Sequence, residues 1–529
     1  MQKEFTLKLK PQEAASTDSI NNYIQQAAGI TAGLNGFTIR KKSIDARSKQ
    51  VWINLTIHAF INEPFIARSN QHYPFPSLKA TAKKVIIIGA GPAGLFAALE
   101  LITLGIKPII IERGKDVKAR RRDLAVLNKE GIVNPDSNYC FGEGGAGTYS
   151  DGKLYTRSSK RGNIDKVLQL FHQFGAEETV LYQSHPHIGT NKLPQIITAM
   201  RQQIIDAGGE FHFEKKLVGF IHENNAIKAI ETADGDRLQA DAYILATGHS
   251  ARDIFQLLAA QKILIEAKPF ALGVRIEHPQ YIIDQSQYHC AVRDPLLPPA
   301  AYSLVEQVDG RGVFSFCMCP GGIIAPAATD PGELVVNGWS PSKRNNPYAN
   351  SGMVVQVTEQ DAMHYFKKNP LLANTQKHPA LLLMHFQQAI EQKAFMAGGG
   401  KFVAPAQKMV DFCTNKISPG LPDCSYLPGL TSVDLRHVLP AFIQQSLQGG
   451  FKAFGKKIKG YYTNEAVVVA TESRTSSPVR IPRDEAGLHH PQLYNLYPCG
   501  EGAGYAGGIV SAAMDGQKIA QVLFTKFRL

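Results

Sequence analysis

The first 78 residues alternate between apolar stretches and polar turns. Phe5, Leu7 and Leu9 are separated by polar residues, which is the period of a half-buried strand. Apolar residues at helical spacing follow over residues 20–27, and residues 37–39 and 51–60 have the pattern of two further strands. A proline-bearing stretch that is typical of a linker comes next. We therefore expect a small βαββ domain over residues 1–78.

A different pattern begins at residue 79. Residues 85–88 are all apolar, as in a strand that is buried on both faces of a parallel sheet. A helical pattern over residues 95–104 and a second apolar run over residues 108–111 follow. A strand, a helix and a second strand in this order predict a βαβ unit with parallel strands.

The middle of the chain mixes strand and helix patterns without this alternation. Strand candidates cover residues 270–276, 313–317 and 334–336, a helix candidate covers residues 381–395, and the earlier pattern returns near residue 496. The expected fold is α/β. A Rossmann-type domain is formed by residues 79–255 and 461–529, and a mixed α+β substrate domain is inserted over residues 256–460.

A glycine fingerprint lies between the first apolar strand and its helix. Gly89, Gly91 and Gly94 are spaced as G-x-G-x-x-G, and Glu112 ends the next strand. In this context the first glycine permits a tight turn, the second lets the backbone approach a pyrophosphate, and the third lets the helix pack on the strand. The acidic residue accepts hydrogen bonds from an adenosine ribose. The motif predicts a dinucleotide site without separating FAD from NAD.

Two later segments distinguish an FAD site from an NAD site. Residues 241–248 are an apolar strand that ends in Ala-Thr-Gly. Residues 496–502 are another strand, in which Glu501 comes directly after Gly500, and residues 507–510 then begin a predicted helix. With the fingerprint, this order resembles the glutathione-reductase-type FAD superfamily. The resemblance implies FAD, with an acidic side chain on the ribitol and a helix N-terminus at the flavin. The position of Glu501 is usually Asp in that superfamily.

Residues 141–154 are rich in glycine and can bring several backbone N–H groups to a planar ligand; the alternative is a mobile surface loop. This segment, residues 112–114, residues 316–322 and residues 474–480 resemble an uncharacterised family of bacterial FAD-dependent dehydrogenases over nearly the whole chain. The residues expected to bind FAD are Gly89, Gly91, Pro92, Ala93, Gly94, Glu112, Arg113, Arg120, Gly144, Gly145, Ala146, Gly147, Thr148, Ser150, Leu217, Thr247, Gly248, Gly500, Glu501, Gly508 and Ile509.

Four residues are candidates for chemistry beside the flavin. Cys317 and Cys319 are two apart in a predicted strand, so both sulfurs could face the flavin or substrate; the alternative is two buried small side chains. Lys153 could stabilise negative charge on reduced flavin or face solvent. Arg474 could bind an anionic group or anchor a loop.

Composition narrows these possibilities only slightly. The 529 residues carry a net charge of +12, which could attract an anionic substrate or a nucleic acid but is equally consistent with solubility alone. Seven cysteines without a C-x-x-C pair suggest neither a disulfide scaffold nor a zinc site, and no metal is expected. No segment has the length and hydropathy of a signal peptide or a membrane span, so we expect a cytoplasmic protein.

The sequence predicts an FAD-dependent oxidoreductase that acts on a small molecule of unknown identity by two-electron transfer. Because no second G-x-G-x-x-G follows a strand, NAD(P)H is expected at most as a transient electron donor. One alternative is a flavin-dependent RNA- or nucleotide-modifying enzyme, although no aromatic and basic RNA platform is evident. Another alternative is a structural or sensory flavoprotein.

Overall fold

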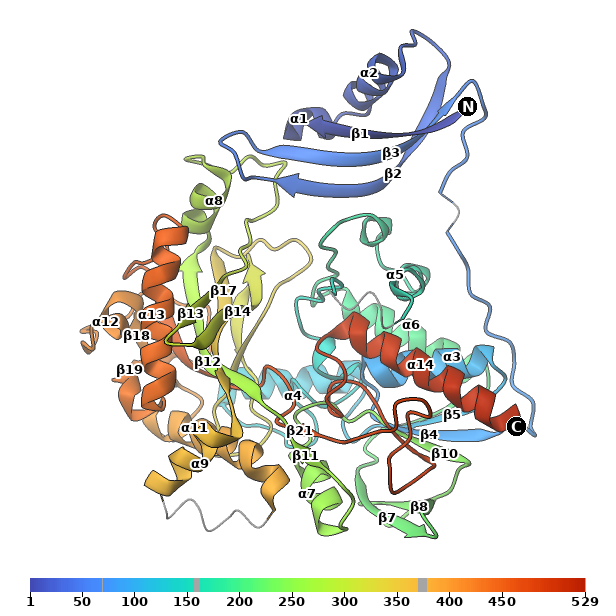
Figure 1. Ribbon diagram of the computed structural model, residues 1–529, viewed down its shortest axis with the longest axis vertical. Helices are drawn as coiled ribbons and strands as arrows, with labels where there is room; N and C mark the ends of the chain where they lie inside the picture. The colour runs from blue at the N-terminus through green and yellow to red at the C-terminus, as the bar shows by residue number, and fades with distance from the viewer. Residues whose placement is uncertain (69, 157–161, 370–377, 529) are drawn as a thin grey trace.

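The computed structural model describes residues 1–68, 70–156, 162–369 and 378–528. The chain forms three bodies that lie around a common centre (Figure 1). A parallel sheet with helices α3 and α14 forms one body, a large antiparallel sheet with helices α11 and α13 forms the second, and a small N-terminal sheet lies across one end of both.

The first body is built on a five-stranded sheet in the order β22-β10-β4-β5-β6, in which every neighbouring pair is parallel. Its central strands are buried on both faces. Val85 and Ile87 pack towards α3 and α14, whereas Ile86 and Ile88 pack towards the opposite cluster, which includes α7 and the β7-β8-β9 sheet. The α/β fold predicted from the sequence is confirmed. The strands are β4 Lys84–Ile88, β5 Lys107–Ile111, β6 Glu210–His212, β10 Ala242–Leu245 and β22 Leu496–Pro498.

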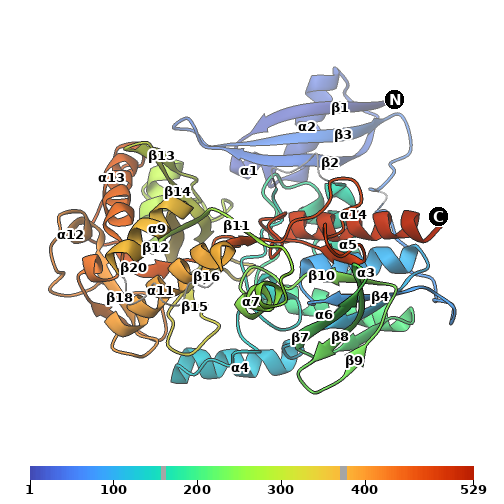
Figure 2. The same cartoon turned by 60° about the horizontal axis from the view of Figure 1, so that its bottom comes forward.

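Helix α14 closes the fold by packing against α3, as both views show (Figures 1 and 2). Their backbones approach closely at Gly516, where an added Cβ would lie 2.1 Å from the carbonyl oxygen of Ala93. The end of the chain therefore completes the domain that begins at β4. The other elements of this body are α3 Pro92–Thr103, α4 Val117–Glu130, α5 Ile164–Gln173, α6 Leu193–Asp206, β7 Leu217–Glu223, β8 Ala226–Thr232, β9 Arg237–Leu238, α7 Arg252–Ala260 and α14 Ile509–Arg528.

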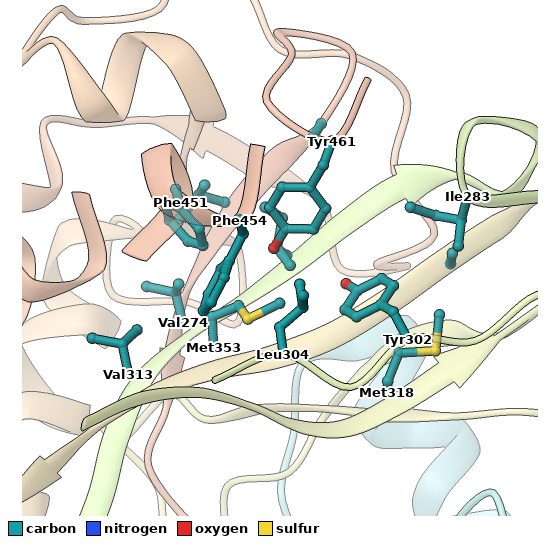
Figure 3. Close-up of a cluster of buried hydrophobic side chains, with 14 of the residues drawn as sticks. Val274, Ile283, Tyr302, Leu304, Val313, Met318, Met353, Phe451, Phe454 and Tyr461 are labelled. Atoms are coloured by element: carbon teal, nitrogen blue, oxygen red, sulfur yellow. The ribbon is translucent and has the colours of Figure 1, made fainter. Parts of the chain in front are cut away.

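The second body, called the insert below, is built on a seven-stranded sheet in the order β13-β14-β17-β12-β20-β18-β19. Phe451 and Phe454 of α13 pack over Val274 of β12, Val313 of β14 and Met353 of β17 (Figure 3). The insert elements are β12 Phe270–Pro279, α8 Gln280–Tyr288, β13 Val305–Val308, β14 Arg311–Pro320, β15 Ile323–Pro326, β16 Val336–Trp339, β17 Tyr348–Val357, α9 Glu359–Lys368, α11 Leu382–Ala397, β18 Ala404–Lys408, α12 Met409–Cys413, β19 Leu430–Ser432, α13 Ala441–Lys457 and β20 Val467–Glu472.

The insert extends beyond residue 460, where the sequence pattern suggested its end. Strand β20, Val467–Glu472, hydrogen-bonds to β12 on one side and to β18 on the other. An apolar strand can belong to either sheet, and only its pairing partners decide which. The chain returns to the first body after this strand, through the short pair β11 Glu266–Ala267 and β21 Val479–Arg480.

The N-terminal body has a three-stranded antiparallel sheet in the order β1-β3-β2, close to the expected βαββ arrangement. It touches both larger bodies. The backbone N–H of Lys42 donates to the carbonyl of Tyr182, and His289 of the insert contacts the carbonyl of Ala46. Its elements are β1 Gln2–Leu9, α1 Pro11–Ala14, α2 Thr17–Ala28, β2 Leu34–Asp45 and β3 Trp52–Ile61.

We expect the N-terminal body to be dispensable for flavin binding. A chain that starts at Thr81 should bind FAD as tightly as the full-length protein, because the cavity described below has no lining residue before Ile88. The flavin-to-protein ratio, measured by absorbance after reconstitution, checks this, with the full-length protein as the control. A folded, soluble truncated chain that binds no flavin would contradict it.

Within the described ranges, no helix is both long and apolar enough to cross a membrane.

Candidate functional site

A cavity of about 370 Å³ lies where the carboxyl ends of β4, β5 and β10 face the insert. In open parallel sheets this edge is where ligands bind. Of the residues predicted to bind FAD, those that line the cavity are Gly89, Gly91, Pro92, Ala93, Glu112, Arg113, Gly145, Ala146, Gly147, Ser150, Leu217, Thr247, Gly248, Glu501, Gly508 and Ile509. Those outside its lining are Gly94, Arg120, Gly144, Thr148 and Gly500.

The absence of a side chain matters for a different reason at each of the three fingerprint glycines. Gly89 has a φ of +107°, and a Cβ there would lie 2.4 Å from the carbonyl oxygen of Ala246. Gly94 packs so closely that a Cβ would lie 2.1 Å from the carbonyl oxygen of Gly89. A Cβ on Gly91 would meet nothing closer than Gly145 Cα, at 3.9 Å. Gly89 and Gly94 are therefore required by the fold, whereas Gly91 leaves room for a ligand at the start of α3.

The Glu112 carboxylate lies at the end of β5 and is almost completely buried. It accepts hydrogen bonds from the backbone N–H groups of Ala90 at 2.9 Å, Gly114 at 2.9 Å and Gly142 at 3.0 Å. Two of these bonds go to Oε1 and one goes to Oε2. A carboxylate has about four acceptor sites, so Oε2 retains one for a hydroxyl group in the cavity.

The glycine-rich segment forms a turn that is held in place by hydrogen bonds from Arg120. This fully buried guanidinium donates to the carbonyl oxygens of Glu143 at 2.8 Å and Gly145 at 2.9 Å, and to Thr148 Oγ1 at 3.2 Å. Gly144 has a φ of +78°. Arg120, Gly144 and Thr148 therefore shape the loop, and Gly145, Ala146 and Gly147 form its surface in the cavity.

The third predicted motif lines the same cavity, next to the start of α3 and the glycine-rich segment. Glu501 lines it, with Oε2 3.5 Å from Nδ1 of His249, and the N-terminus of α14 follows at Ile509. A Cβ on Gly507 or Gly508 would meet nothing within 4 Å. Gly500 lies behind this surface, where its N–H donates to Asp515.

We expect Glu501→Ala to weaken FAD binding by roughly ten- to a hundredfold without unfolding the chain. A charge-assisted hydrogen bond to a ribitol hydroxyl contributes about 1.5–3 kcal/mol, and each 1.4 kcal/mol is about a factor of ten in affinity. Glu501→Asp should be milder. Titration of apo-protein with FAD, followed by flavin fluorescence, measures the effect, and the exposed Glu485→Ala is the control. Wild-type affinity in a folded Glu501→Ala variant would show that this side chain does not touch the cofactor.

Lys153 and the two cysteines converge, although not as strand alternation predicts. Lys153 Nζ lies 3.8 Å from Cys317 Sγ and 3.7 Å from Cys319 Sγ. Pairing of β14 with β17 shifts by one residue between Phe316 and Cys319, and Cys317 has a φ of +45°. Because this bulge breaks the alternation, Cys317 and Lys153 line the cavity while Cys319 is fully buried outside its lining.

Arg474 lines the cavity, but its guanidinium is engaged in a buried ion-pair network. Nε and Nη2 donate to Glu391, Nη1 donates to Thr329, and Nη2 also lies 3.2 Å from Glu333. Arg252 of α7 binds the same two carboxylates, each at 2.7 Å. Arg252 therefore links the insert to the first body, and Arg474 holds the same two carboxylates from the end of β20, which favours the anchoring role over substrate binding.

Burial and charge act in opposite directions within this network. Burial raises the pKa of Glu333 to about 7, outweighing the attraction of the two arginines. For Glu391 the same arginines outweigh burial and lower its pKa to about 2. Sequence reasoning missed Arg252, Glu333 and Glu391, because nothing local in the chain marks them as partners.

A second charged group near Lys153 was also missed. Asp151 lies 3.1 Å from Lys153 Nζ and 2.7 Å from Arg344 Nη2. Burial raises the pKa of Asp151, but the two cations hold it well below its usual range. Burial, followed by the charge of Arg344, lowers the pKa of His187 to about 4. The only sequence signal was the position of Asp151 and Lys153 within the glycine-rich segment.

The residues present fit FAD. Glycines without a Cβ leave space at Gly91 and Gly508, at the two helix N-termini where phosphate and flavin oxygens would be stabilised. Glu112 has a free acceptor site for a ribose, and Glu501 is placed for a ribitol. Across the described parts of the chain, no group of three or more His, Cys, Asp or Glu residues is arranged to hold a metal ion.

Three family descriptions match successive parts of the chain. Residues 82–246 match "FAD binding domain", residues 269–475 match "FAD-dependent protein, C-terminal domain-like", and residues 1–60 match "Domain of unknown function (DUF8436)". The second range corresponds to the insert, β20 included. These descriptions support FAD as the cofactor, but they do not extend to the glutathione-reductase-type superfamily, so that narrower assignment is not confirmed.

Two solved structures are similar to the chain at a low level. A 2,6-dihydroxypyridine-3-hydroxylase from Arthrobacter nicotinovorans is 12% identical to this chain with a TM-score of 0.38. The alignment covers 84% of this chain and 84% of that one. A geranylgeranyl bacteriochlorophyll reductase-like protein from Thermoplasma acidophilum is 12% identical with a TM-score of 0.35, and the alignment covers 84% of this chain and 79% of that one. Such low scores carry no argument about the activity of this chain.

A relative with much higher identity is an uncharacterized protein from Clostridium beijerinckii (strain ATCC 51743 / NCIMB 8052). It is 39% identical over 509 residues, which cover 93% of this chain and 92% of the relative. Identity of this extent includes the N-terminal body, the cofactor-binding domain and the insert. The chain therefore belongs to the same family as this protein, and its two larger regions match descriptions of an FAD-binding domain and of an FAD-dependent protein.

Proposed function

We propose that this protein is an FAD-dependent oxidoreductase that transfers two electrons between its flavin and a small molecule bound against the insert. The observation that carries the proposal is one cavity that is lined by Gly91, Glu112, Glu501 and Lys153 of the first body and by Cys317 of the insert. Structural or sensory flavins do not require such a wall of reactive side chains beside the cofactor. The cofactor domain and the insert thus supply different halves of one site.

When bound, FAD supplies the electron-transfer chemistry, and the protein supplies binding, orientation and charge. Glu112 would hold the adenosine ribose and Glu501 the ribitol. The N-termini of α3 and α14 would stabilise negative charge on the phosphates and the flavin. Lys153 would place a cation opposite the substrate, held in position by Asp151.

The substrate and the electron donor are further parts of this proposal. We infer a small molecule, because the cavity of about 370 Å³ is modest for a site that also holds a cofactor. The sequence has no second dinucleotide fingerprint, so the electron donor would be transiently bound NAD(P)H, another protein or the substrate itself. The order of the three cofactor motifs also favours a glutathione-reductase-type arrangement of the FAD.

The first experiment identifies the cofactor and its reactivity. Denaturation of the purified protein should release FAD. FMN lacks the adenosine ribose that Glu112 would bind, and the two later motifs favour FAD over NAD. Chromatography separates FAD from FMN and NAD. Anaerobic photoreduction followed by a screen of electron acceptors should then find one that reoxidises the flavin rapidly. Release of FMN or NAD alone, or a flavin that no acceptor reoxidises, would contradict the proposal.

A further inference from the structure

Cys317, Cys319 and Lys153 form a compact group in the wall of the cavity. The ammonium of Lys153 contacts both sulfurs, at 3.8 Å and 3.7 Å, and the thiol of Cys319 donates to the carbonyl oxygen of Cys317 at 3.2 Å. The side chain of Cys319 therefore folds back towards Cys317. Two thiols of strand β14 therefore share one cation from a distant segment of the chain.

Two features of β14 hold the cysteines in this arrangement, namely the buried side chain of Met318 and the bulge. Met318, between the two cysteines, is buried in the insert core beside Tyr302 (Figure 3). The bulge in β14 and the positive φ of Cys317 let both neighbours of Met318 approach Lys153. A regular strand has no such extra residue, and bulges commonly redirect side chains beside active sites.

A second cation lies on the far side of the pair. Arg275 is fully buried, and its Nη2 donates to the carbonyl oxygen of Cys317 at 2.6 Å and lies 3.6 Å from Cys319 Sγ. Glu472 neutralises Arg275 through Nη1 at 2.9 Å. The sulfurs therefore lie between a guanidinium and an ammonium, a setting that favours a thiolate.

The two thiols are electrostatically different. A hydrogen bond from Cys319 lowers the pKa of Cys317 well below its usual value, and the charges of Lys153 and Arg275 lower it further. The same hydrogen bond, together with burial, raises the pKa of Cys319 well above its usual value. Cys317 is also the one that lines the cavity. The pair thus has a half-buried, thiolate-forming member that lines the cavity and a fully buried, protonated member outside the lining.

We propose that Cys317 and Cys319 are a redox-active thiol pair that reduces disulfide substrates in the cavity. The Cys317 thiolate attacks one sulfur of a disulfide RSSR, forming a mixed disulfide and releasing one thiol. Cys319, after losing its proton, attacks Cys317 Sγ, forming the Cys317–Cys319 disulfide and releasing the second thiol. The sum is one dithiol plus RSSR giving one protein disulfide plus two RSH.

The cycle closes when the protein disulfide takes up two electrons and two protons from the reduced flavin. This part rests on the proposed function, whereas the exchange reaction does not. Lys153 is placed to stabilise the thiolates that form when the disulfide breaks. The proposal therefore gives the unknown substrate a chemical class, low-molecular-weight disulfides.

Glutathione disulfide is the probe for the exchange reaction. Incubation of the holoprotein should form the Cys317–Cys319 disulfide, detected by peptide mass spectrometry as a loss of two hydrogens, with two fewer titratable thiols. In Cys319→Ser, glutathione should remain attached to Cys317, because no second thiol displaces it. The control Cys290→Ser removes a thiol outside the cavity lining and should behave as wild type. A Cys319→Ser variant without glutathione on Cys317 would overturn the proposal.

Lys153→Met tests the role of the cation by a readout other than turnover. Alkylation of Cys317 by iodoacetamide at pH 7 should slow by about tenfold, because a neighbouring positive charge lowers a thiol pKa by about one unit or more. Its pH profile should also shift upwards. An unchanged rate and profile would contradict stabilisation of the thiolate by Lys153.

The link to the flavin is tested separately. Photoreduction of the oxidised holoprotein under anaerobic conditions should restore two thiols, whereas Cys317→Ser should show no gain. A protein disulfide that persists beside fully reduced flavin would overturn the electron route. A protein that binds no flavin would instead refute the proposed function, and the exchange reaction with glutathione disulfide would still be measured on its own.

Discussion

Gly91→Val is expected to weaken flavin binding by about a hundredfold or more, while the chain still folds. Gly91 has a φ of −75°, which valine adopts without strain, and an added Cβ would meet only Gly145 Cα, at 3.9 Å. The side chain would instead occupy the space through which a pyrophosphate approaches the start of α3. Apo-protein titrated with FAD gives the affinity, and circular dichroism and thermal unfolding report the fold.

Two further glycine variants test whether the loss of FAD binding is specific to the position of Gly91. Gly420→Val is the control, because a Cβ there meets nothing within 4 Å, and Gly420 lies outside the cavity lining. It should bind FAD as wild type does. Gly94→Ala should destabilise the fold itself, because its Cβ would lie 2.1 Å from the carbonyl oxygen of Gly89. A folded Gly91→Val protein with normal FAD affinity would place the cofactor elsewhere.

Arg474→Met is expected to lower the free energy of unfolding by about 3–5 kcal/mol, because it leaves buried carboxylates with too few partners. The Arg474 side chain is 3% exposed, and it contacts both Glu391 and Glu333. The remaining Arg252 cannot replace all of these bonds. Denaturant unfolding of the wild type and the variant measures the loss, and flavin content reports whether the insert still closes the cavity.

A double variant distinguishes lost charge balance from lost packing. Arg474→Met combined with Glu333→Gln restores the balance of one cation and one anion, so it should recover part of the stability. The exposed pair of Arg237 and Glu231 provides the control, and Arg237→Met should change stability little. If Arg474→Met unfolds at the same denaturant concentration as wild type, the network does not fasten the insert.

Local backbone requirements explain why so much of the cofactor site could be predicted. The positive φ of Gly89 and the close approach of Gly94 to the carbonyl oxygen of Gly89 are requirements of the turn between β4 and α3, and Glu112 follows at the end of the next strand. The parallel sheet then brings strand ends together, so motifs far apart along the chain meet at one edge. Glu501 and Gly248 line the same cavity as Gly91 for this reason.

The sequence by itself determined the α/β fold, the position of the cofactor motifs and the pair of cysteines as candidates. Only the tertiary structure decided that β20 belongs to the insert, that Arg474 is bound by Glu333 and Glu391, and that a bulge brings Cys317 and Cys319 to Lys153. The physical reason is how far apart along the chain the interacting residues lie. Periodicity and turn residues reflect what each segment needs locally, whereas strand pairing, bulges and buried ion pairs depend on residues far away along the chain. Arg474 and Glu391 are 83 positions apart, and Lys153 and Cys317 are 164 positions apart.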